Sequence, residues 1–373
     1  MILLFILIVL KIYAIKDGIY LGTNKIKFLS FYEIFNNTIE NKTILIFEPN
    51  PYHHECTPGY SKYFIDLGYN VDLLIHFSGI DSFSLFREVK KIRLLIFNNL
   101  DDIYRNSKNL SSIMKKYDFI LIQTTNNNKK ELFKKLNFFN INNSIFVFHN
   151  IKIIDENYSN YLKLNRIWTI GNFSKGLQVN PHFFGDIQLK EKKDKTVFFL
   201  TSSYQRNYTF LIESSKRLKD ENFNFELIIT GRSRTFNRRQ IPKNLHNIFK
   251  FKFNVSYYEM YKSIEKSDYI IIPINPDNQY NLQYKENISS GSIQLVYGFV
   301  KPAIIHEEFA SFYKLDNQNS LIYNNIFDFY SIMKKAILLN NKDYKKMQDN
   351  IQAIEKDIYK VSINNIKKIV NKI

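Results

Sequence analysis

Short apolar runs and stretches of helical spacing alternate through the first half of the chain. Residues 43–48 form an apolar run between turn residues, which is typical of a buried strand. Residues 60–67 have helical spacing and stop at Gly68, a frequent residue just after a helix, and residues 71–76 form the next apolar run. A strand, a helix and a strand in this order predict a βαβ unit, and hence the start of a parallel sheet.

The same alternation continues and then repeats in the second half. Further strands of the first half are predicted at 92–97, 119–123, 144–149 and 168–170, with helices around 105–116 and 127–137 and a linker at 180–194. Strands of the second half are predicted at 196–201, 225–230, 247–253, 269–274 and 303–305, with helices at 208–219, 256–266 and 292–299. From residue 328 to the end the pattern is helical.

Two similar series of elements predict an α/β protein with two Rossmann-like, doubly wound domains that face each other across a cleft. A length of 373 residues also favours two domains, because single cores stop growing below this size. Ligands of such sheets bind at the carboxyl ends of the strands. The expected parts are an apolar N-terminal segment with a lead-in (1–40), a first domain (41–180), a second domain (195–345) and a helical segment (346–373) that crosses back to the first domain.

The charge of the chain is strongly positive. With 52 basic and 35 acidic residues, the formal net charge is +17. Such a surface attracts phosphorylated small molecules, anionic membranes or nucleic acid, although a merely solvated cationic surface is an equally good interpretation. Because no nucleic-acid recognition motif accompanies the charge, we expect no nucleic-acid partner.

The N-terminus and the single cysteine bear on localisation. Residues 1–10 are apolar and Lys11 interrupts the run, which is shorter than the roughly 20 residues that span a bilayer as a helix. A monotopic anchor or a buried element fits this stretch better than a signal peptide. Cys56 is the only cysteine, so no disulfide can form within the chain. These features predict a cytoplasmic protein, with the cytoplasmic face of a membrane as the alternative place of work.

A candidate phosphate site lies at the turn before the predicted helix 292–299. Ser290, Gly291 and Ser292 precede an apolar helical run, so free backbone N–H groups and the positive end of the helix point at one spot. The alternative is an ordinary serine cap with a glycine turn. Arg206, which follows the strand that ends near Ser202, lies where it can reach a diphosphate at this turn. Gly231 closes the next strand at the same edge of the sheet.

These pieces occur in an order that resembles a known family. Arg206-Asn207, then Leu227-Ile228-Ile229 before Gly231, then Ser267-Asp268, and finally Glu286 with Ser290-Gly291 leading to Lys301-Pro302 follow one another between residues 196 and 306. This succession resembles the C-terminal domain of GT-B glycosyltransferases, specifically the large retaining group called family 4.

The resemblance implies roles for these residues. In that family a Glu followed, after seven residues, by a second Glu marks the donor site, the first contacting the sugar and the second the nucleotide ribose. Glu286 matches the first position, whereas Gln294 occupies the second and has no charge. Arg206 and the amides of residues 290–292 would stabilise the leaving diphosphate. The implied catalytic residues are Glu286 and Arg206, and the implied donor-binding residues are Ser202, Gly231, Ser290, Gly291, Ser292 and Gln294.

The loop after the first strand resembles the acceptor side of these enzymes. His53 or His54 would contact the acceptor, Glu55 would orient its hydroxyl, and Gly59 would permit close approach; His149 ends another strand at the same edge. A metal site at His53-His54-Glu55 is a poorer interpretation, because no third ligand follows at a suitable spacing. Hydrogen-bonded histidines in a polar loop are the remaining alternative.

Together these observations predict a glycosyltransferase that moves a sugar, with retention, from a nucleotide sugar to a hydroxyl of a glycan or lipid-linked acceptor. The nucleotide sugar is a substrate, and no cofactor or metal is expected. The basic surface and the apolar N-terminus favour peripheral contact with a membrane, where lipid-linked acceptors lie, and polysaccharide biosynthesis is the expected process. Two alternatives remain open: a non-catalytic binding protein with the same fold, because fold alone does not define function, and a nucleotide-sugar epimerase with a similar cleft.

Overall fold

The computed structural model describes residues 27–30, 35, 38–86, 89–126, 129–140, 142–203, 206–231 and 236–370. The chain divides into two compact units. The first comprises residues up to 148 together with 153–168 and 183–186, and the second comprises 149–152, 169–182 and 187–373. The apolar segment 1–16, predicted as an anchor or buried element, lies outside the described residues.

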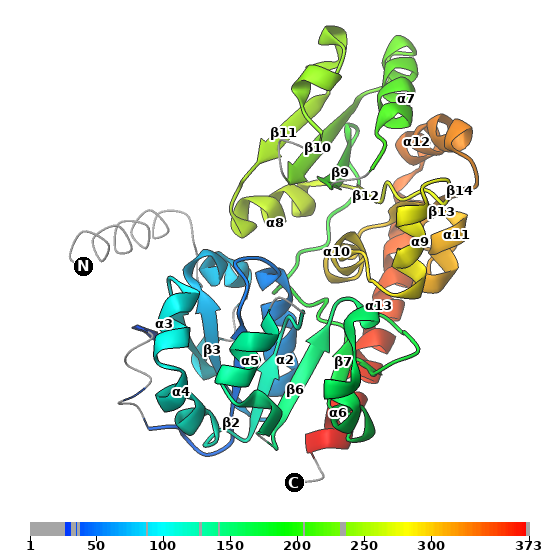
Figure 1. Ribbon diagram of the computed structural model, residues 1–373. Coiled ribbons are helices and arrows are strands. Elements are labelled where there is room, and N and C mark those ends of the chain that lie inside the picture. Colours follow the sequence, from blue (N-terminus) through cyan, green and yellow to red (C-terminus); the bar gives the residue numbers. More distant parts are fainter. Residues whose placement is uncertain are drawn as a thin grey trace, which may run out of the picture. The chain divides into compact units, whose positions relative to one another are not determined.

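The first unit is built on a largely parallel sheet (Figure 1). Its strand order is β1-β4-β3-β2-β5-β6-β7-β8, and counted from β2 the strands from β4 to β7 follow the Rossmann order 3-2-1-4-5-6. The strands are β1 (Lys27–Ser30), β2 (Thr43–Glu48), β3 (Asn70–His76), β4 (Ile92–Phe97), β5 (Phe119–Ile122), β6 (Ser144–Phe148) and β7 (Ile167–Thr169). The last strand of the order, β8 (Leu177–Gln178), belongs to the segment 169–182 of the second unit. The helices between them are α2 (Thr57–Asp66), α3 (Leu100–Arg105), α4 (Ser107–Met114), α5 (Lys130–Lys135) and α6 (Ser159–Lys163).

The predicted βαβ unit at the start of this sheet is confirmed. β2 is buried at all of its positions, as an apolar run predicts, and it pairs in parallel with β3 through Ile44 and Val71. α2 has a proline in its first turn, where the missing N–H costs nothing. Gly68 follows the helix with a φ of +83°, a backbone conformation that suits glycine.

The second unit repeats the design with a six-stranded sheet. Its order β11-β10-β9-β12-β13-β14 is again 3-2-1-4-5-6, and neighbouring strands are parallel. The strands are β9 (Thr196–Ser202), β10 (Phe225–Gly231), β11 (Phe249–Phe253), β12 (Tyr269–Ile271), β13 (Ala303–His306) and β14 (Leu321–Tyr323). The helices are α7 (Thr209–Asp220), α8 (Tyr257–Lys266), α9 (Gln279–Glu286), α10 (Gly291–Phe299), α11 (Glu307–Ala310), α12 (Phe329–Leu338) and α13 (Asn341–Val370).

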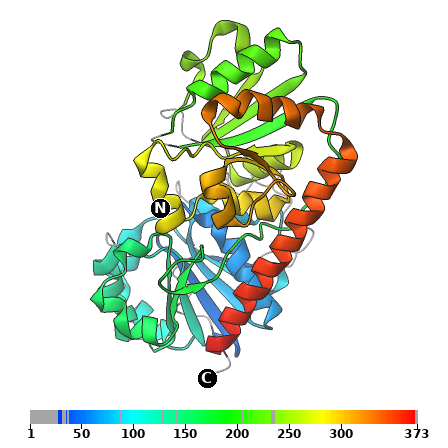
Figure 2. The same cartoon turned by 90° about the vertical axis from the view of Figure 1, so that its right-hand side faces the viewer.

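The long helix α13 (Figure 2) is held to other parts of the second unit by side-chain hydrogen bonds. Near its start, the Tyr344 hydroxyl donates to Asp268 O at 2.8 Å. Further along, Ser362 Oγ accepts from Asn180 N at 3.0 Å, and Asn365 Nδ2 donates to Gln178 O at 2.8 Å. These bonds fix the start of α13 to the residue before β12 and its later turns to residues 178–180.

Several elements of the second unit were absent from the sequence prediction, and one was predicted too long. α9, α11 and β14 were not predicted, and the strand expected at 269–274 ends at Ile271. Pro273 has no N–H for a ladder, so the chain leaves the sheet there. Among the described residues, no helix is long and apolar enough to cross a membrane.

Candidate functional site

Each sheet has a topological switch point, where the direction of the strand order reverses. In the first unit it lies between β2 and β5, and in the second between β9 and β12. Ligands of doubly wound sheets bind outside the carboxyl ends of the strands at such points.

On the donor side, the end of β9 is bonded directly to the start of α10. Thr201 Oγ1 and Ser292 Oγ lie 2.9 Å apart, and both side chains belong to elements at the switch point. Ser290 caps α10 with extended backbone angles but makes no side-chain capping bond. A Cβ placed on Gly291 would meet no atom within 4 Å, so the first turn of the helix is open at this residue.

Arg206 lies beside the Thr201–Ser292 pair. Its Nη1 donates to Thr201 O at 3.4 Å, and its Cζ lies 6.0 Å from the centre of the Tyr284 ring on α9. The Tyr313 hydroxyl accepts from Ser290 N at 3.3 Å and donates to Tyr284 O. The structure thus brings together Arg206, Ser290 and Ser292, as the sequence analysis predicted.

Several polar atoms in this group are buried but unbonded. Arg206 Nε, Ser290 Oγ and Gln294 Oε1 have no hydrogen-bond partner among the described residues. Most buried polar groups in proteins are satisfied, and those left over need an explanation such as a ligand. A diphosphate would accept from Arg206 Nε, from the Ser290 hydroxyl and from the amides that begin α10.

Ser202 and Gly231 lie side by side at the ends of neighbouring strands. They are paired in the β9–β10 register. Gly231 has a φ of +117°, and a Cβ at this position would lie 2.6 Å from Ser202 Oγ and 2.7 Å from Ser202 O. Only glycine therefore fits here. Residues 232–235, which include Arg232, lie outside the described residues.

Glu286 is the last residue of α9 and is exposed. Its carboxylate accepts from Asn287 Nδ2 at 3.3 Å. The connection that follows pairs with the segment after β6, because Asn150 forms an antiparallel bridge with Ile288 and Ile151 N donates to Asn287 O at 3.0 Å. His149, which was predicted on the acceptor side, directly precedes Asn150 in the chain. It is therefore next to the segment that pairs with the connection between Glu286 and Ser290.

On the acceptor side, the carboxyl ends of β2 and β5 converge on a buried carboxylate. Glu48 ends β2 and has no exposed surface. Its oxygens accept hydrogen bonds from Asn50 N and Nδ2 (2.8 and 2.9 Å), from Gln123 Nε2 (3.0 Å) and from Thr124 Oγ1. Burial raises the pKa of Glu48 to about 7, although these hydrogen bonds act in the opposite direction.

His53 and Glu55 lie in the adjoining loop. His53 Nδ1 lies 3.4 Å from Glu55 Oε1, and both side chains are partly exposed, His53 by 39%. Burial lowers the pKa of His53, but the hydrogen bond and charge of Glu55 and the charge of Glu48 outweigh it, so the pKa is raised. A partly exposed histidine beside a carboxylate can bind a hydroxyl and hold its proton.

His54 and Gly59 differ from His53 in exposure. The His54 ring is fully buried and packs so closely on Gly79 that a Cβ there would lie 2.3 Å from its Cγ. Burial lowers the pKa of His54 to about 4, and neither ring nitrogen has a hydrogen-bond partner among the described residues. Gly59 is buried within the first turn of α2. In this conformation neither residue offers a surface to an acceptor.

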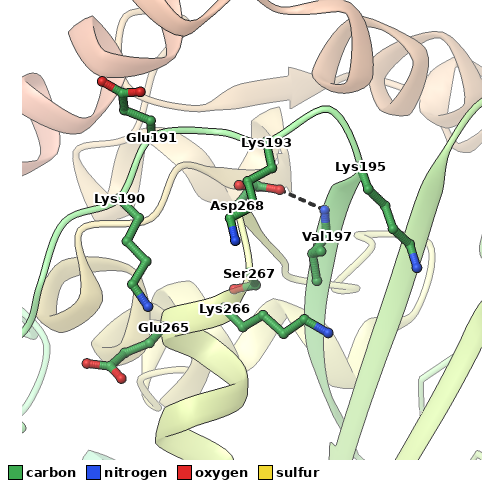
Figure 3. Close-up of a pocket in the computed structure, with 9 residues that line it drawn as sticks. All are labelled: Lys190, Glu191, Lys193, Lys195, Val197, Glu265, Lys266, Ser267 and Asp268. Atoms are coloured by element: carbon green, nitrogen blue, oxygen red, sulfur yellow. Dashed lines mark hydrogen bonds between the residues drawn. The ribbon is translucent and has the colours of Figure 1, made fainter.

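A pocket of about 170 Å³ lies at the opposite, amino-terminal edge of the second sheet (Figure 3). Val197, near the start of β9, donates its N–H to Asp268 Oδ2 at 2.7 Å. Lys195 and Lys266 both pair with Glu226, at 2.8 and 3.1 Å, so carboxylates offset these cations. No residue predicted for the donor site lines this pocket, whose walls are Lys190, Glu191, Lys193, Lys195, Val197, Glu265, Lys266, Ser267 and Asp268.

Some residues at the two switch points were not singled out from the sequence. Glu48, Gln123 and Thr124 in the first unit and Tyr284 and Tyr313 in the second all make the contacts described above. A charged residue that closes a fully apolar strand, as Glu48 does, is a signal that would have found the first group. Among the described residues, no group of three or more His, Cys, Asp or Glu side chains is placed to hold a metal ion.

Comparison with known proteins identifies the fold. No family model matches the chain, and no curated protein does so either. Among solved structures, a glycosyltransferase from Rickettsia africae ESF-5 matches with a TM-score of 0.52 and 14% identity, covering 89% of this chain and 99% of that one. Anabaena Alr3699/HepE in complex with UDP and glucose matches with a TM-score of 0.50 and 12% identity, covering 89% and 100%.

A third similar structure is sucrose-phosphate synthase from Thermosynechococcus elongatus, with a TM-score of 0.51, 10% identity and coverage of 89% and 99%. Each match extends over nearly the whole of the other chain. The present chain therefore has the GT-B fold of two Rossmann-like domains, as the resemblance of its second half implied.

Proposed function

We propose that this protein is a glycosyltransferase that takes a sugar from a nucleotide-sugar donor held by its second unit. The observation that supports this best is the group at the end of β9, where Thr201 is bonded to Ser292 and Arg206 lies beside them. Arg206 Nε, Ser290 Oγ and Gln294 Oε1 have no hydrogen-bond partner among the described residues, and Ser290 and Gln294 belong to the cap and the first turn of the nine-residue helix α10. Such a set suits the diphosphate of a nucleotide sugar.

In this proposal the group acts by electrostatic stabilisation. Negative charge develops on the diphosphate as the bond to the sugar breaks. Arg206 and the amides that begin α10 would stabilise that charge without moving. The hydrogen bonds from Arg206 to Thr201 O, between Thr201 and Ser292 and from Ser290 N to Tyr313 already hold these segments in place. Glu286 would contact the sugar, and Gln294 a ribose hydroxyl. Because the Anabaena structure is a complex with UDP and glucose, a UDP-sugar is the first donor to test.

The acceptor would bind at the carboxyl edge of the first sheet. His53 and Glu55 are the exposed pair there, and His53 would hold the proton of the attacking hydroxyl. We propose a glycan or lipid-linked hydroxyl as acceptor, with peripheral membrane contact through the basic surface. Retention, assignment to family 4 and a reaction without a metal are further parts of this proposal.

Alanine variants of the donor residues test the proposal. Nucleotide release from a panel of nucleotide sugars would be measured in full-length protein carrying Arg206→Ala or Glu286→Ala. Each should lose about 100-fold or more in rate, the effect of removing one preorganised charge-stabilising group, while the melting temperature stays within a few degrees. Arg239→Ala and Glu213→Ala are matched controls, because both residues are exposed in the same unit. Full turnover in both donor variants would refute the assignment.

One observation favours a second candidate, a non-catalytic binding protein of the same fold. The family pattern has a charged Glu at the position of Gln294, and this side chain is buried with an unbonded Oε1. Nucleotide binding without release of nucleotide from any donor in the panel would support this candidate instead.

A further inference from the structure

The burial of Glu48 is energetically unfavourable. This residue is fully buried, and among the described residues no lysine or arginine forms an ion pair with it. A buried carboxylate without a cation is destabilising, and such groups cluster at functional sites. Glu48 is also at the switch point of the first sheet, since it ends β2 beside β5. It cannot itself touch a substrate, because no part of it is exposed.

The hydrogen bonds of Glu48 connect two segments that the chain separates by about seventy residues. Asn50 belongs to the loop after β2, and Gln123 and Thr124 follow β5. Gln123 bonds both to the end of β2 and to the loop after it, because its Nε2 donates to Glu48 Oε2 at 3.0 Å and to His53 O at 2.7 Å. One amide group thus connects the buried carboxylate to the backbone of His53.

The His53 backbone needs such support. Its φ of 71° and ψ of 13° lie in the left-handed region, which is unfavourable for a residue other than glycine. Two donors hold its carbonyl, Gln123 Nε2 and Cys56 N, the latter at 3.2 Å. The left-handed turn sets the direction in which the His53 side chain leaves the chain, toward Glu55.

We propose that Glu48 and Gln123 are positioning residues that fix the left-handed turn at His53 and thereby the place of its ring on the acceptor side. Glu48 orients the Gln123 amide, and Gln123 in turn holds the His53 carbonyl. The catalytic meaning of this arrangement rests on the proposed function, whereas the positioning itself does not. Among the described residues, the titratable groups whose charges interact with Glu48 are His53, Lys129, Cys56 and Tyr60, and Glu55 faces His53.

A pair of substitutions separates positioning from general stability. Gln123→Met keeps the size of the side chain but removes the donor to both Glu48 and His53. Thr124→Val removes one donor to Glu48 and leaves the bond to His53 intact, so it is the matched control. In full-length protein, hydrogen exchange of the amides at 50–56 and the titration of the His53 ring by NMR would be measured for both.

In Gln123→Met we expect exchange at 50–56 to accelerate about tenfold, the equivalent of one lost net hydrogen bond, and the His53 titration to shift. Thr124→Val should leave the exchange rates at 50–56 and the His53 titration unchanged, even where it lowers the melting temperature as much as Gln123→Met does. The proposal would be overturned if Gln123→Met showed the same exchange at 50–56 as the wild-type protein and an unshifted His53 titration. Should Gln123→Met fail to fold, Gln123→Asn, which is too short to reach both partners, replaces it.

Kinetics then distinguish this proposal from the proposed function. If both hold, Gln123→Met reduces transfer while the KM for the nucleotide sugar stays the same, because the donor residues belong to the other unit. If wild-type protein shows no turnover but the exchange and NMR results are as expected, the function fails and the positioning stands. Normal transfer in a variant whose His53 turn has loosened would show that the turn does not serve catalysis.

Discussion

Glu48 and His54 are buried titratable residues whose effects on stability oppose each other. Burial raises the pKa of Glu48 from 4.5 to about 7, so its contribution to the free energy of unfolding is fully present below pH 4.5 and is lost as pH rises through 7. Burial lowers the pKa of His54 from 6.5 to about 4, so its contribution is present above pH 6.5 and is lost as pH falls toward 4. Between pH 4.5 and pH 6.5 the free energy of unfolding therefore changes little with pH from these two residues, because their contributions change in opposite directions.

Replacing Glu48 should therefore expose the slope of His54. In Glu48→Gln the free energy of unfolding should fall by about 2–3 kcal/mol more than in wild type as pH is lowered from 7 to 5, because one pKa unit corresponds to about 1.4 kcal/mol. Urea unfolding across this pH range measures the difference. Parallel pH profiles for the two proteins would show that Glu48 is ionised in the folded state throughout.

At the scale of elements, the connection between α9 and α10 depends on one hydroxyl from outside it. Tyr313 OH accepts from Ser290 N and donates to Tyr284 O, so it joins the last turn of α9 to the cap of α10. Tyr313→Phe leaves the buried Ser290 N–H without this partner, at a cost of about 1–3 kcal/mol. We expect weaker nucleotide binding as well, because the cap that would hold the diphosphate is no longer fixed.

Tyr344→Phe is the control for this prediction. It removes a comparable bond, from the Tyr344 hydroxyl to Asp268 O, at the amino-terminal edge of the same sheet. Calorimetric titration with UDP should show reduced affinity only in Tyr313→Phe, although both variants lose stability. The same loss of affinity in both would mean that the connection does not depend on Tyr313 specifically.

The elements that the sequence predicted are those whose apolar runs are long and closed by a turn residue. β2, β9 and β10 are buried along almost their whole length, and that is why periodicity identified them. α9 was missed because its Asn, Gln, Tyr and Lys residues give it no apolar face. β14 was missed because a strand of three residues is too short to show a periodic pattern. Pattern alone does not locate elements whose burial depends on tertiary contacts.

Some residues of the candidate site could likewise be predicted from the sequence and others could not. Arg206, Ser290 and Ser292 were predictable because strand ends and a helix start converge wherever parallel strands alternate with helices. Tyr313 was not, since it contributes a hydroxyl from a distant turn and no local pattern marks it. His54 was selected for its residue type, and sequence cannot show that its ring would pack under Gly79.

At the scale of the whole molecule, two units with the same strand order carry different chemistry at their switch points. The first presents a buried carboxylate and a partly exposed histidine, and the second an arginine with a helix start. The repeated architecture explains why one chain has two candidate sites at strand ends. The difference between the sites follows from a few residues after β2, β5 and β9, and not from the fold.

The net charge of +17 makes it necessary to separate specific from general attraction of anions. A nucleotide that binds only the folded protein raises its stability by about 2.7 kcal/mol at one hundred times its Kd, which gives a melting shift of a few degrees. We expect UDP to produce this shift, uridine to produce less, and Arg206→Ala to reduce the shift with UDP while Arg239→Ala does not. A shift that follows the number of phosphates alone and is equal in both variants would indicate general attraction.

Salt provides the final discrimination. Raising the ionic strength from about 0.1 M to about 1 M shortens the Debye length from about 10 Å to about 3 Å, which screens the long-range field of the surface lysines. Contacts from Arg206 and the amides of α10 act at hydrogen-bond distance in a partly buried group and are screened much less. The shift with UDP should thus persist at high salt, whereas binding of an unspecific polyanion such as heparin should disappear. Loss of both together would place UDP on the general basic surface rather than at the end of β9.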